Sequence, residues 1–149
     1  MRQRVIVDAG PLAALLNSCD SHHDWARREW RNIAPPLLTC EAVVSEAGLL
    51  GQRAGRGKPA DVLEMVRRGI LDISFSLSAE IDKVSALMSK YRNIPMSVAD
   101  ACLVRMSELH RGSPVLTLDR DFAIYRGKRR RPIPLLSPGI SSSGSIPSD

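Results

Sequence analysis

Short apolar runs alternate with longer amphipathic segments along the chain. Residues 5–7 are β-branched and predict a buried strand, whereas Ile81, Val84 and Leu87 recur at the spacing of a helix. The two patterns predict strands at residues 4–7, 35–40, 70–76, 114–119 and 133–136. They predict helices from Pro11 and over residues 21–33, 41–50, 59–68, 78–91 and 97–110.

Residues that favour helix starts support these assignments. Ser21 with Asp24, and Ser97 with Asp100, have the spacing of a capping box. The other predicted starts carry a hydroxyl cap or a proline at the first helical position, namely Pro11, Thr39, Pro59 and Ser78. The stretch GQRAGRGKP, residues 51–59, is predicted to be a loop.

Alternating strands and helices indicate an α/β fold in which right-handed crossovers build a mainly parallel sheet. The 149 residues suffice for one domain with its own core, and we assign residues 1–137 to it. Residues 138–149 are rich in Ser, Gly and Pro and are predicted to form a flexible tail. Ligands of such sheets bind beyond the carboxyl ends of the strands.

The composition is that of an ordinary globular protein, 44% hydrophobic and 25% charged, with a net charge of +5. Positive charge favours anionic partners such as nucleic acid. Three scattered cysteines without a C-x-x-C pair favour reduced thiols and a cytoplasmic location. Asp8 and Pro11 interrupt the apolar start, which argues against a signal peptide. No apolar run approaches the ~20 residues of a membrane span, so no membrane partner is expected.

Acidic residues follow two of the predicted strands. Asp8 ends the first strand, and Asp119 ends the strand at residues 114–119, with Asp121 two positions further on. Each of them alone would be an ordinary turn residue. Because the carboxyl ends of parallel strands meet at one edge of a sheet, Asp8 and Asp119 are expected to lie close together.

Two further acids are predicted on helices. Glu46 shares a helix face with Ala42, Val43 and Leu50, which places it on the apolar side. Asp100 either caps its helix together with Ser97 or lies buried in it, where a free charge needs a partner or a metal.

Taken together, these acids indicate a metal site. Clustered carboxylates repel each other, so their crowding should raise at least one carboxyl pKa unless a cation lies between them. Oxygen ligands suit Mg²⁺ or Mn²⁺. Such an ion can activate water and hold a phosphate for in-line attack, and the basic composition makes a nucleic-acid phosphodiester the natural substrate.

Four segments in this order resemble the PIN-domain ribonucleases, and in particular the VapC-type toxins of toxin–antitoxin pairs. They are IVDAGPLAALL, VVSEAGLL, MSVADACLV and VLTLDRDFAIYR, and the resemblance extends from about residue 5 to residue 136. It implies a three-layer α/β/α sandwich around a parallel sheet of about five strands. It also implies Mg²⁺- or Mn²⁺-dependent endoribonuclease activity on RNA, a small antitoxin partner and a homodimer.

The resemblance also implies roles for individual residues. Asp8, Glu46, Asp100 and Asp119 match the acidic quartet of the family, and Asp121 is a fifth candidate metal ligand. Thr117 is implied to orient either Asp119 or a metal-bound water. The chain departs from many relatives in having Ala9-Gly10 where a hydroxyl residue follows the first Asp, which removes a hydrogen bond near the metal.

Other features carry weaker hypotheses. Residues 51–59 lack the second Gly and the Ser/Thr of a phosphate-binding loop, so Arg53, Arg56 and Lys58 are either solvated or contact an RNA backbone. His22 and His23 are adjacent and cannot share a helix face as metal ligands would. The run RGKRRRP, residues 126–132, is either a solvated basic turn or a site that steers phosphates.

Two alternative functions remain beside the ribonuclease. One is a catalytically weak PIN module that binds RNA as a scaffold, and the other is a phosphotransfer domain of similar topology. The phosphotransfer reading requires an acceptor Asp in a central strand and a Lys near the last strands, and no such pattern is present.

Overall fold

The computed structural model describes residues 4–55 and 58–139. Its sheet has five strands of two residues each, paired in the order β3-β2-β1-β4-β5. All four strand pairs are parallel. The strands are β1 (Ile6–Val7), β2 (Leu37–Leu38), β3 (Leu71–Asp72), β4 (Val115–Leu116) and β5 (Leu135–Leu136). The predicted parallel five-stranded sheet is confirmed.

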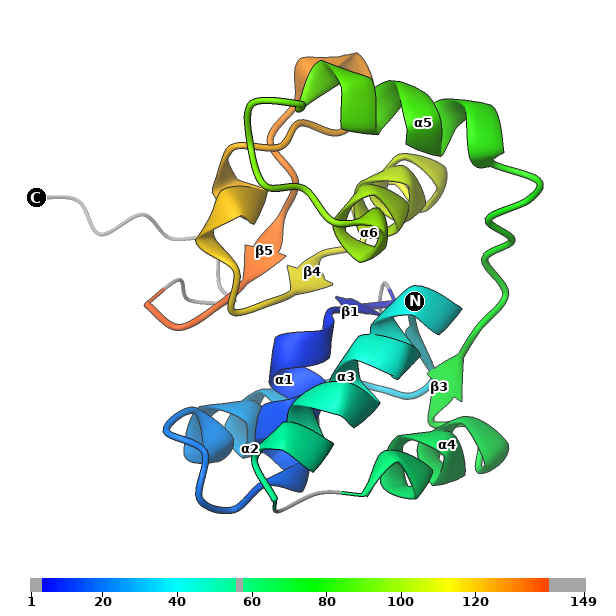
Figure 1. Ribbon diagram of the computed structural model, residues 1–149. Coiled ribbons are helices and arrows are strands. Elements are labelled where there is room, and N and C mark those ends of the chain that lie inside the picture. The colour runs from blue at the N-terminus through cyan, green and yellow to red at the C-terminus, as the bar shows by residue number, and fades with distance from the viewer. Residues whose placement is uncertain (1–3, 56–57, 140–149) are drawn as a thin grey trace, which may run out of the picture.

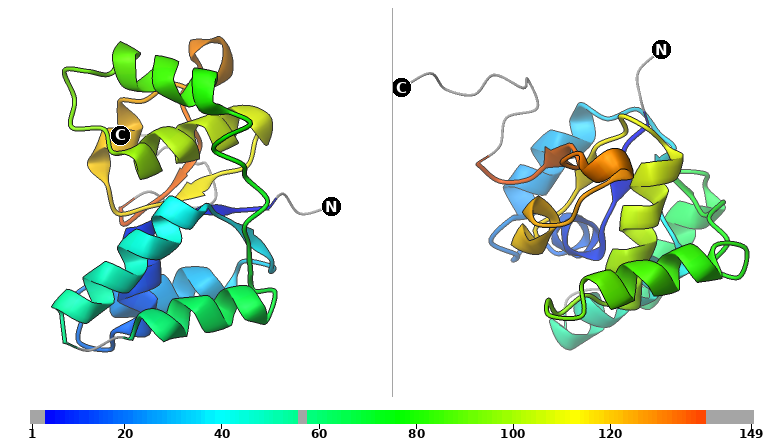
Figure 2. Two further views of the ribbon diagram at one scale, coloured as in Figure 1. Left: turned by 45° about the vertical axis from the view of Figure 1, so that its right-hand side comes forward. Right: turned by 90° about the horizontal axis from the view of Figure 1, so that it is seen from above.

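Helices cover both faces of this sheet (Figure 1). They are α1 (Ala9–Leu16), α2 (His23–Arg31), α3 (Glu41–Arg53), α4 (Pro59–Arg67), α5 (Ile81–Lys90) and α6 (Val98–Leu109), with short 3₁₀ helices η1 (Arg120–Ala123) and η2 (Lys128–Arg130). Helices α1 to α4 form one outer layer, and α5 with α6 forms the other (Figure 2). The three-layer sandwich is therefore present. Within the described ranges, no helix combines the length and the apolar character needed to cross a membrane.

The strand order explains both the layers and the position of the site. The chain first moves outward from β1 to β2 and β3, and it then returns across the sheet to place β4 on the other side of β1. Right-handed crossovers that run in opposite directions put their helices on opposite faces. The direction changes between β1 and β4, so a crevice opens beyond the carboxyl ends of these two strands.

The core is built from the strands and from α6. Ile6, Val7, Leu116 and the α6 residue Leu103 are fully buried. An aromatic cluster secures the segment after β4, where the rings of Phe122 and Tyr125 pack edge to face with centroids 5.2 Å apart. Tyr125 packs in the same way on Tyr91 of the loop after α5, at 5.0 Å. The chain that leaves β4 is thereby fixed although it contains little regular structure.

Several predicted helix starts are wrong by a few residues. Helix α1 begins at Ala9, because the Asp8 side chain accepts a hydrogen bond from the Ala9 backbone N–H at 2.7 Å. The predicted Ser21–Asp24 box does not form, and α2 begins at His23. The side chain of Asp20 already turns the chain there by accepting from the His22 N–H at 2.8 Å.

Thr39 and Ser78 are not caps either. The Thr39 hydroxyl donates to the carbonyl oxygen of Val7 at 3.0 Å, so it joins two strands, and Cys40 occupies the cap position of α3. Glu80 occupies the cap position of α5. Helix α3 continues to Arg53, beyond the predicted loop start at residue 51, and residues 56–57 of that loop lie outside the described residues. Most of the predicted tail, residues 140–149, also lies outside them.

Candidate active site

Four carboxylates line one cleft beyond the carboxyl ends of β1 and β4. The cleft has a volume of about 410 Å³, and Asp8, Glu46, Asp100 and Asp119 all contribute to its wall. They come from the end of β1, from α3, from the first turn of α6 and from the loop after β4. The remaining wall is formed by Gly10, Leu50, Pro95, Ser97 and Leu118. The structure thus brings together the four acids of the predicted quartet.

Asp8 is the most deeply placed of the four, with 7% of its surface exposed. One carboxylate oxygen caps α1, and the other accepts a hydrogen bond from the Thr117 hydroxyl at 2.8 Å. Burial raises the pKa of the Asp8 carboxyl from 3.8 to about 6, although the two hydrogen bonds lower it, and the charges of Asp100 and Glu46 raise it further. A raised pKa was predicted from mutual repulsion, but removal from water is the larger cause.

Thr117 connects the acids of the two strands. Its fully buried hydroxyl donates to Asp8 and accepts from the Asp119 backbone N–H at 2.9 Å. Asp119 Oδ1 in turn accepts from the Asp121 N–H at 2.9 Å, which starts η1. Thr117 therefore holds Asp119 through its backbone, in line with one of the two roles that the resemblance implies, and it also orients the carboxylate of Asp8.

Asp100 both forms the capping box with Ser97 and lies buried, so the two interpretations that the sequence left open hold together. Its carboxylate accepts from the Ser97 N–H, and its own N–H donates to the Ser97 hydroxyl, both at 3.0 Å. Only 8% of its surface is exposed. Burial raises its pKa, hydrogen bonds to Ser97 lower it, and the charges of Asp119 and Asp121 raise it. The capping box holds the carboxylate in place at the cleft wall.

Glu46 lies at the rim of the cleft. The prediction that it shares the apolar side of its helix is only partly right, because Val43 is buried while Glu46 itself is exposed. Partial burial raises its pKa first, and the charges of Asp100 and Asp119 raise it further. Glu46 is thus the acid of the quartet with the most freedom to move.

Asp121, the fifth predicted candidate, is absent from the cleft wall. It is half-buried in η1, and its backbone N–H supports Asp119. Its charge nevertheless reaches the site, because it raises the pKa of Asp100.

The donor set fits a hard divalent cation. The described wall of the cleft contains no Lys, Arg or His that could balance the negative charge. The carboxyl pKa values of Asp8, Glu46 and Asp100 are all raised. Carboxylate oxygens suit Mg²⁺ or Mn²⁺, and Mg²⁺ keeps several water ligands. Within the described residues, no three His, Cys, Asp or Glu side chains converge tightly enough to enclose an ion. The residues therefore fit an open site, completed by water, better than a closed cage.

A second hollow, which sequence reasoning missed, continues from the cleft. It has a volume of about 250 Å³ and shares Gly10, Leu50 and Leu118 with the cleft. Its outer wall comes from the loop before α2, including Asn17 and His22. A Cβ at position 10 would lie 3.2 Å from the Leu118 side chain, so Gly10 keeps the passage between the two spaces wide. Nothing in the local pattern marks these residues, because the hollow exists only where α1, α3 and the β4 loop meet.

The fold is that of a PIN domain. The family model for the PIN domain matches residues 5–128, and the chain belongs to this family. Among curated proteins, it is similar to Ribonuclease VapC26 of Mycobacterium tuberculosis, with 26% identity over 117 residues that cover 78% of this chain and 87% of the relative. Among solved structures, it is similar to the crystal structure of Mycobacterium tuberculosis VapC20, described as a sarcin–ricin loop cleaving toxin. The TM-score is 0.70 at 21% identity, over 80% of this chain and 93% of that one, and this likeness shows a common fold.

Proposed function

We propose that this chain is an endoribonuclease that cleaves RNA phosphodiesters with a Mg²⁺ or Mn²⁺ ion, and that it is the toxin of a toxin–antitoxin pair. The observation that carries the proposal is the cleft of four carboxylates without a cationic side chain, at the crevice between β1 and β4 of a PIN domain. The similarity to a protein named as a ribonuclease supports the same activity.

The residues of the chain have distinct tasks in this reaction. A divalent ion in the cleft would lower the pKa of a water molecule and offset charge on the phosphate. Asp8, Asp100, Asp119 and Glu46 would hold it. Asp8 and Asp100 are fixed before any ligand arrives, because backbone N–H groups and hydroxyls already restrain their carboxylates. Such prior orientation reduces the reorganisation that the transition state requires.

Other residues of the site position and surround the four acids. The Thr117 hydroxyl donates to one oxygen of the Asp8 carboxylate and so restrains its rotation. The backbone N–H of Asp121 donates to the carboxylate of Asp119. Leu50, Pro95 and Leu118 add apolar surface to the wall beside the acids. Exposed Glu46 can adjust to the substrate at the rim.

The partners that we propose are RNA, a small antitoxin protein and a second copy of this chain. The last two are supported by the family resemblance and by large apolar side chains on the surface, such as Leu63 (59% exposed) and Leu49 (45%). Three free cysteines support a cytoplasmic location, where thiols stay reduced.

A second candidate function is an RNA-binding module with weak catalysis. It is favoured by Ala9-Gly10, which supply no hydroxyl beside Asp8. The intact acidic quartet favours the enzyme.

The test is cleavage of a mixed RNA by the purified chain with Mg²⁺, with Mn²⁺ and with a chelator. We expect cleavage with either metal only, and a loss of about 100-fold or more on Asp119→Asn because an amide is a poor ligand for hard cations. Asp72→Asn is the matched control, since Asp72 also ends a strand but pairs with Arg4 at 3.5 Å outside the cleft. Equal activity of the parent and Asp119→Asn would contradict the proposal. Binding of RNA without cleavage by the parent would favour the scaffold.

A further inference from the structure

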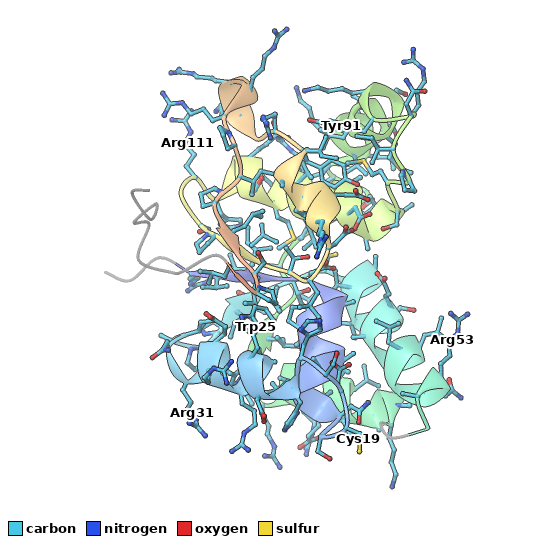
Figure 3. All side chains as sticks on the ribbon, turned by 90° about the vertical axis from the view of Figure 1, so that its left-hand side faces the viewer. Cys19, Trp25, Arg31, Arg53, Tyr91 and Arg111 are labelled. Carbon is cyan, nitrogen blue, oxygen red and sulfur yellow. The ribbon has the colours of Figure 1, made fainter. Side chains whose placement is uncertain are left out.

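A groove of about 270 Å³ lies at the opposite edge of the sheet from the acids. It is formed where α6 ends and where the chain enters β4 and β5, and we call it the basic groove. Four cationic side chains line it together with Ser107, namely Arg111, Lys128, Arg129 and Arg131. Asp8 and Asp119 follow β1 and β4, whereas Arg111 precedes β4 and the other three cations precede β5, so the strands separate the two charged regions. Arg111 lies beside η2 in Figure 3.

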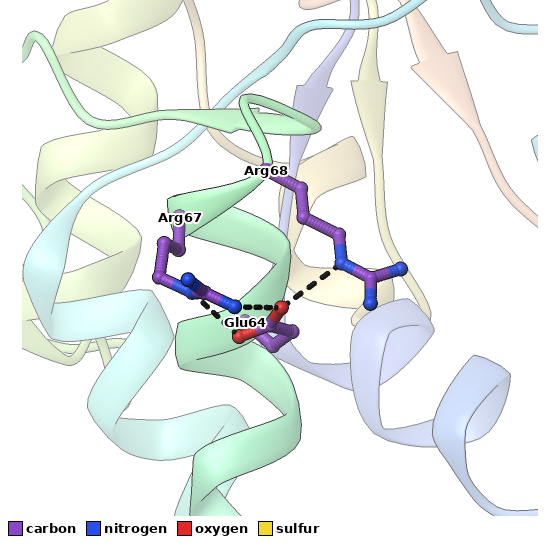
Figure 4. A network of polar contacts seen from close by, with 3 residues as sticks. All are labelled: Glu64, Arg67 and Arg68. Carbon is purple, nitrogen blue, oxygen red and sulfur yellow. Dashed lines mark hydrogen bonds and ion pairs between the residues drawn. The ribbon is translucent and has the colours of Figure 1, made fainter.

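The four cations of the basic groove have no acidic partner among the described residues, in contrast to the ion-paired arginines of α4 and α6. On α4, both Arg67 and Arg68 bind Glu64, at 2.6 and 3.0 Å (Figure 4). Arg105 of α6 binds Glu80 at 2.8 Å. By contrast, within residues 4–55 and 58–139 none of the four groove cations forms an ion pair. Their charges are therefore available to a ligand.

The backbone beneath these side chains is held in an unfavourable conformation. Arg129 and Arg130 have φ of 59° and 60°, the left-handed region in which glycine is favoured. Two consecutive arginines there are strained, because each Cβ comes too close to the following carbonyl oxygen. The turn that results directs Arg129 and Arg131 to the groove wall. Such strain persists where the rest of the structure imposes it, and it often accompanies a functional surface.

We propose that the basic groove binds the phosphate backbone of the RNA substrate at a distance from the bond that is cleaved. This inference rests on the proposed ribonuclease function and adds a substrate class to it: an RNA that extends beyond the cleavage site. Guanidinium groups bind phosphates through paired hydrogen bonds. Gly112 and Gly127 in the wall allow a backbone to approach closely. The described wall contains no aromatic side chain on which bases could stack, so contacts to the phosphates would supply the binding.

A single RNA strand accounts for both charged regions better than an acidic peptide does. Helix α6 carries Asp100 in its first turn and Ser107 near its end, a separation of about 10 Å along the axis at 1.5 Å per residue. Arg111 lies just beyond the end of this helix. One continuous polyanion can therefore reach the groove while its cleaved phosphate lies at the acids. A short oligonucleotide confined to the cleft cannot do so.

The experiment compares two substrates that share one cleavage site, a folded RNA hairpin and an oligonucleotide of only a few nucleotides. For Arg129→Ala with Arg131→Ala, we expect KM for the hairpin to rise about 10-fold while kcat stays within about two-fold. The oligonucleotide should be cleaved as by the parent. The slope of log affinity for the hairpin against log salt should fall by roughly 0.7–0.9 for each lost phosphate contact. Arg27→Ala with Arg31→Ala on α2 is the charge-matched control, and in Figure 3 Arg31 lies on the other side of the sheet from Arg111.

A second variant separates binding from folding. Arg129→Gly removes one cation but suits the left-handed backbone, so the melting temperature should be equal to or above that of the parent while hairpin affinity falls. Hairpin affinity is measured with chelator, so the test does not depend on catalysis. Even if the parent cleaves no RNA, its affinity still shows whether the basic groove binds the hairpin. The proposal is overturned if the groove variants bind the hairpin as the parent does, if both substrates are affected equally, or if the α2 control reproduces the effect.

Discussion

Acidic side chains gather beyond the carboxyl end of β4, and basic side chains gather at its amino end. The two groups differ in burial and in hydrogen bonding. At the carboxyl end, Asp8 and Asp100 are more than nine-tenths buried and restrained by hydrogen bonds. At the amino end, Arg129 and Arg131 are exposed and have no anionic partner among the described residues. Burial and restraint fix the direction of a group and shift its pKa, whereas exposure leaves its charge free and screened by salt. The acidic end is therefore suited to chemistry, and the basic end to affinity.

The largest effect should come from Asp100, the acid that forms a capping box with Ser97. Asp100→Asn should lower RNA cleavage by about 1,000-fold or more, equivalent to about 4 kcal/mol of transition-state stabilisation. The fold should persist, because the amide oxygen can still accept from the Ser97 N–H. Cleavage rate and circular dichroism are the measurements.

Ser97→Ala separates capping from catalysis in the same turn. It removes the acceptor of the Asp100 N–H and should lower stability by about 1 kcal/mol, with a far smaller effect on the rate than Asp100→Asn. If Asp100→Asn is folded and fully active, Asp100 is only a cap.

The next largest effect concerns the stability of the metal-free protein. The raised folded pKa of Asp8 means that the folded state holds its proton more tightly than the unfolded chain. The resulting cost begins as pH rises above the ordinary value of 3.8 and is complete above about 6, where it amounts to about 3 kcal/mol. Asp8→Asn should remove this cost while abolishing activity. The net gain at pH 7 should be smaller, about 1–2 kcal/mol, because the buried Thr117 hydroxyl loses its carboxylate acceptor.

Urea unfolding from pH 3.5 to 7.5 with chelator measures this difference. The gain of Asp8→Asn over the parent should be absent at the acid end and grow through pH 4–6. Mn²⁺ should then raise the melting temperature of the parent far more than that of the variant, since it binds the folded site. A variant that is less stable at neutral pH and responds equally to Mn²⁺ would identify Asp8 as an ordinary cap.

A comparable effect on stability, with a smaller effect on activity, should follow from loss of the hydroxyl between the acids. Thr117→Val leaves Asp8 Oδ2 and the Asp119 N–H without this partner and should cost about 1–3 kcal/mol. Thr39→Val is the matched control, because that hydroxyl is equally buried and donates to the Val7 carbonyl. Both variants should unfold more easily, but only Thr117→Val should raise the pKa of Asp8, moving the acid limb of the pH–rate profile to higher pH. An identical shift in both variants would show that Thr117 is merely structural.

The smallest effect on stability should belong to the rim. Glu46→Gln changes an exposed side chain, so stability should stay within about 0.5 kcal/mol of the parent. Cleavage should nevertheless fall, because one oxygen ligand is lost, and the Mn²⁺ concentration needed for half-maximal rate should rise. Unchanged metal dependence would restrict the ligand set to the three aspartates.

The sequence by itself determined the alternation of strands and helices and therefore the parallel sheet. It also indicated the acids, because Asp8 and Asp119 follow apolar runs whose carboxyl ends must meet at one edge. Local periodicity was sufficient for these inferences, since each depends on residues close together in the chain. The same local rules failed at Ser21, where Asp20 turns the chain instead, and at Thr39, whose hydroxyl binds the Val7 carbonyl.

Only the tertiary structure decided which groups control the acids. The bond from Thr117 to Asp8 joins residues 109 positions apart, and no spacing along the chain predicts it. The exposure of Glu46 depends on how α3 meets the cleft, not on its helical face alone. The basic run was visible in the sequence, but its position at the amino ends of β4 and β5 follows from the path of the chain after η1. Burial and distance between remote segments set pKa values and charge separation, and these quantities exist only once the layers have packed.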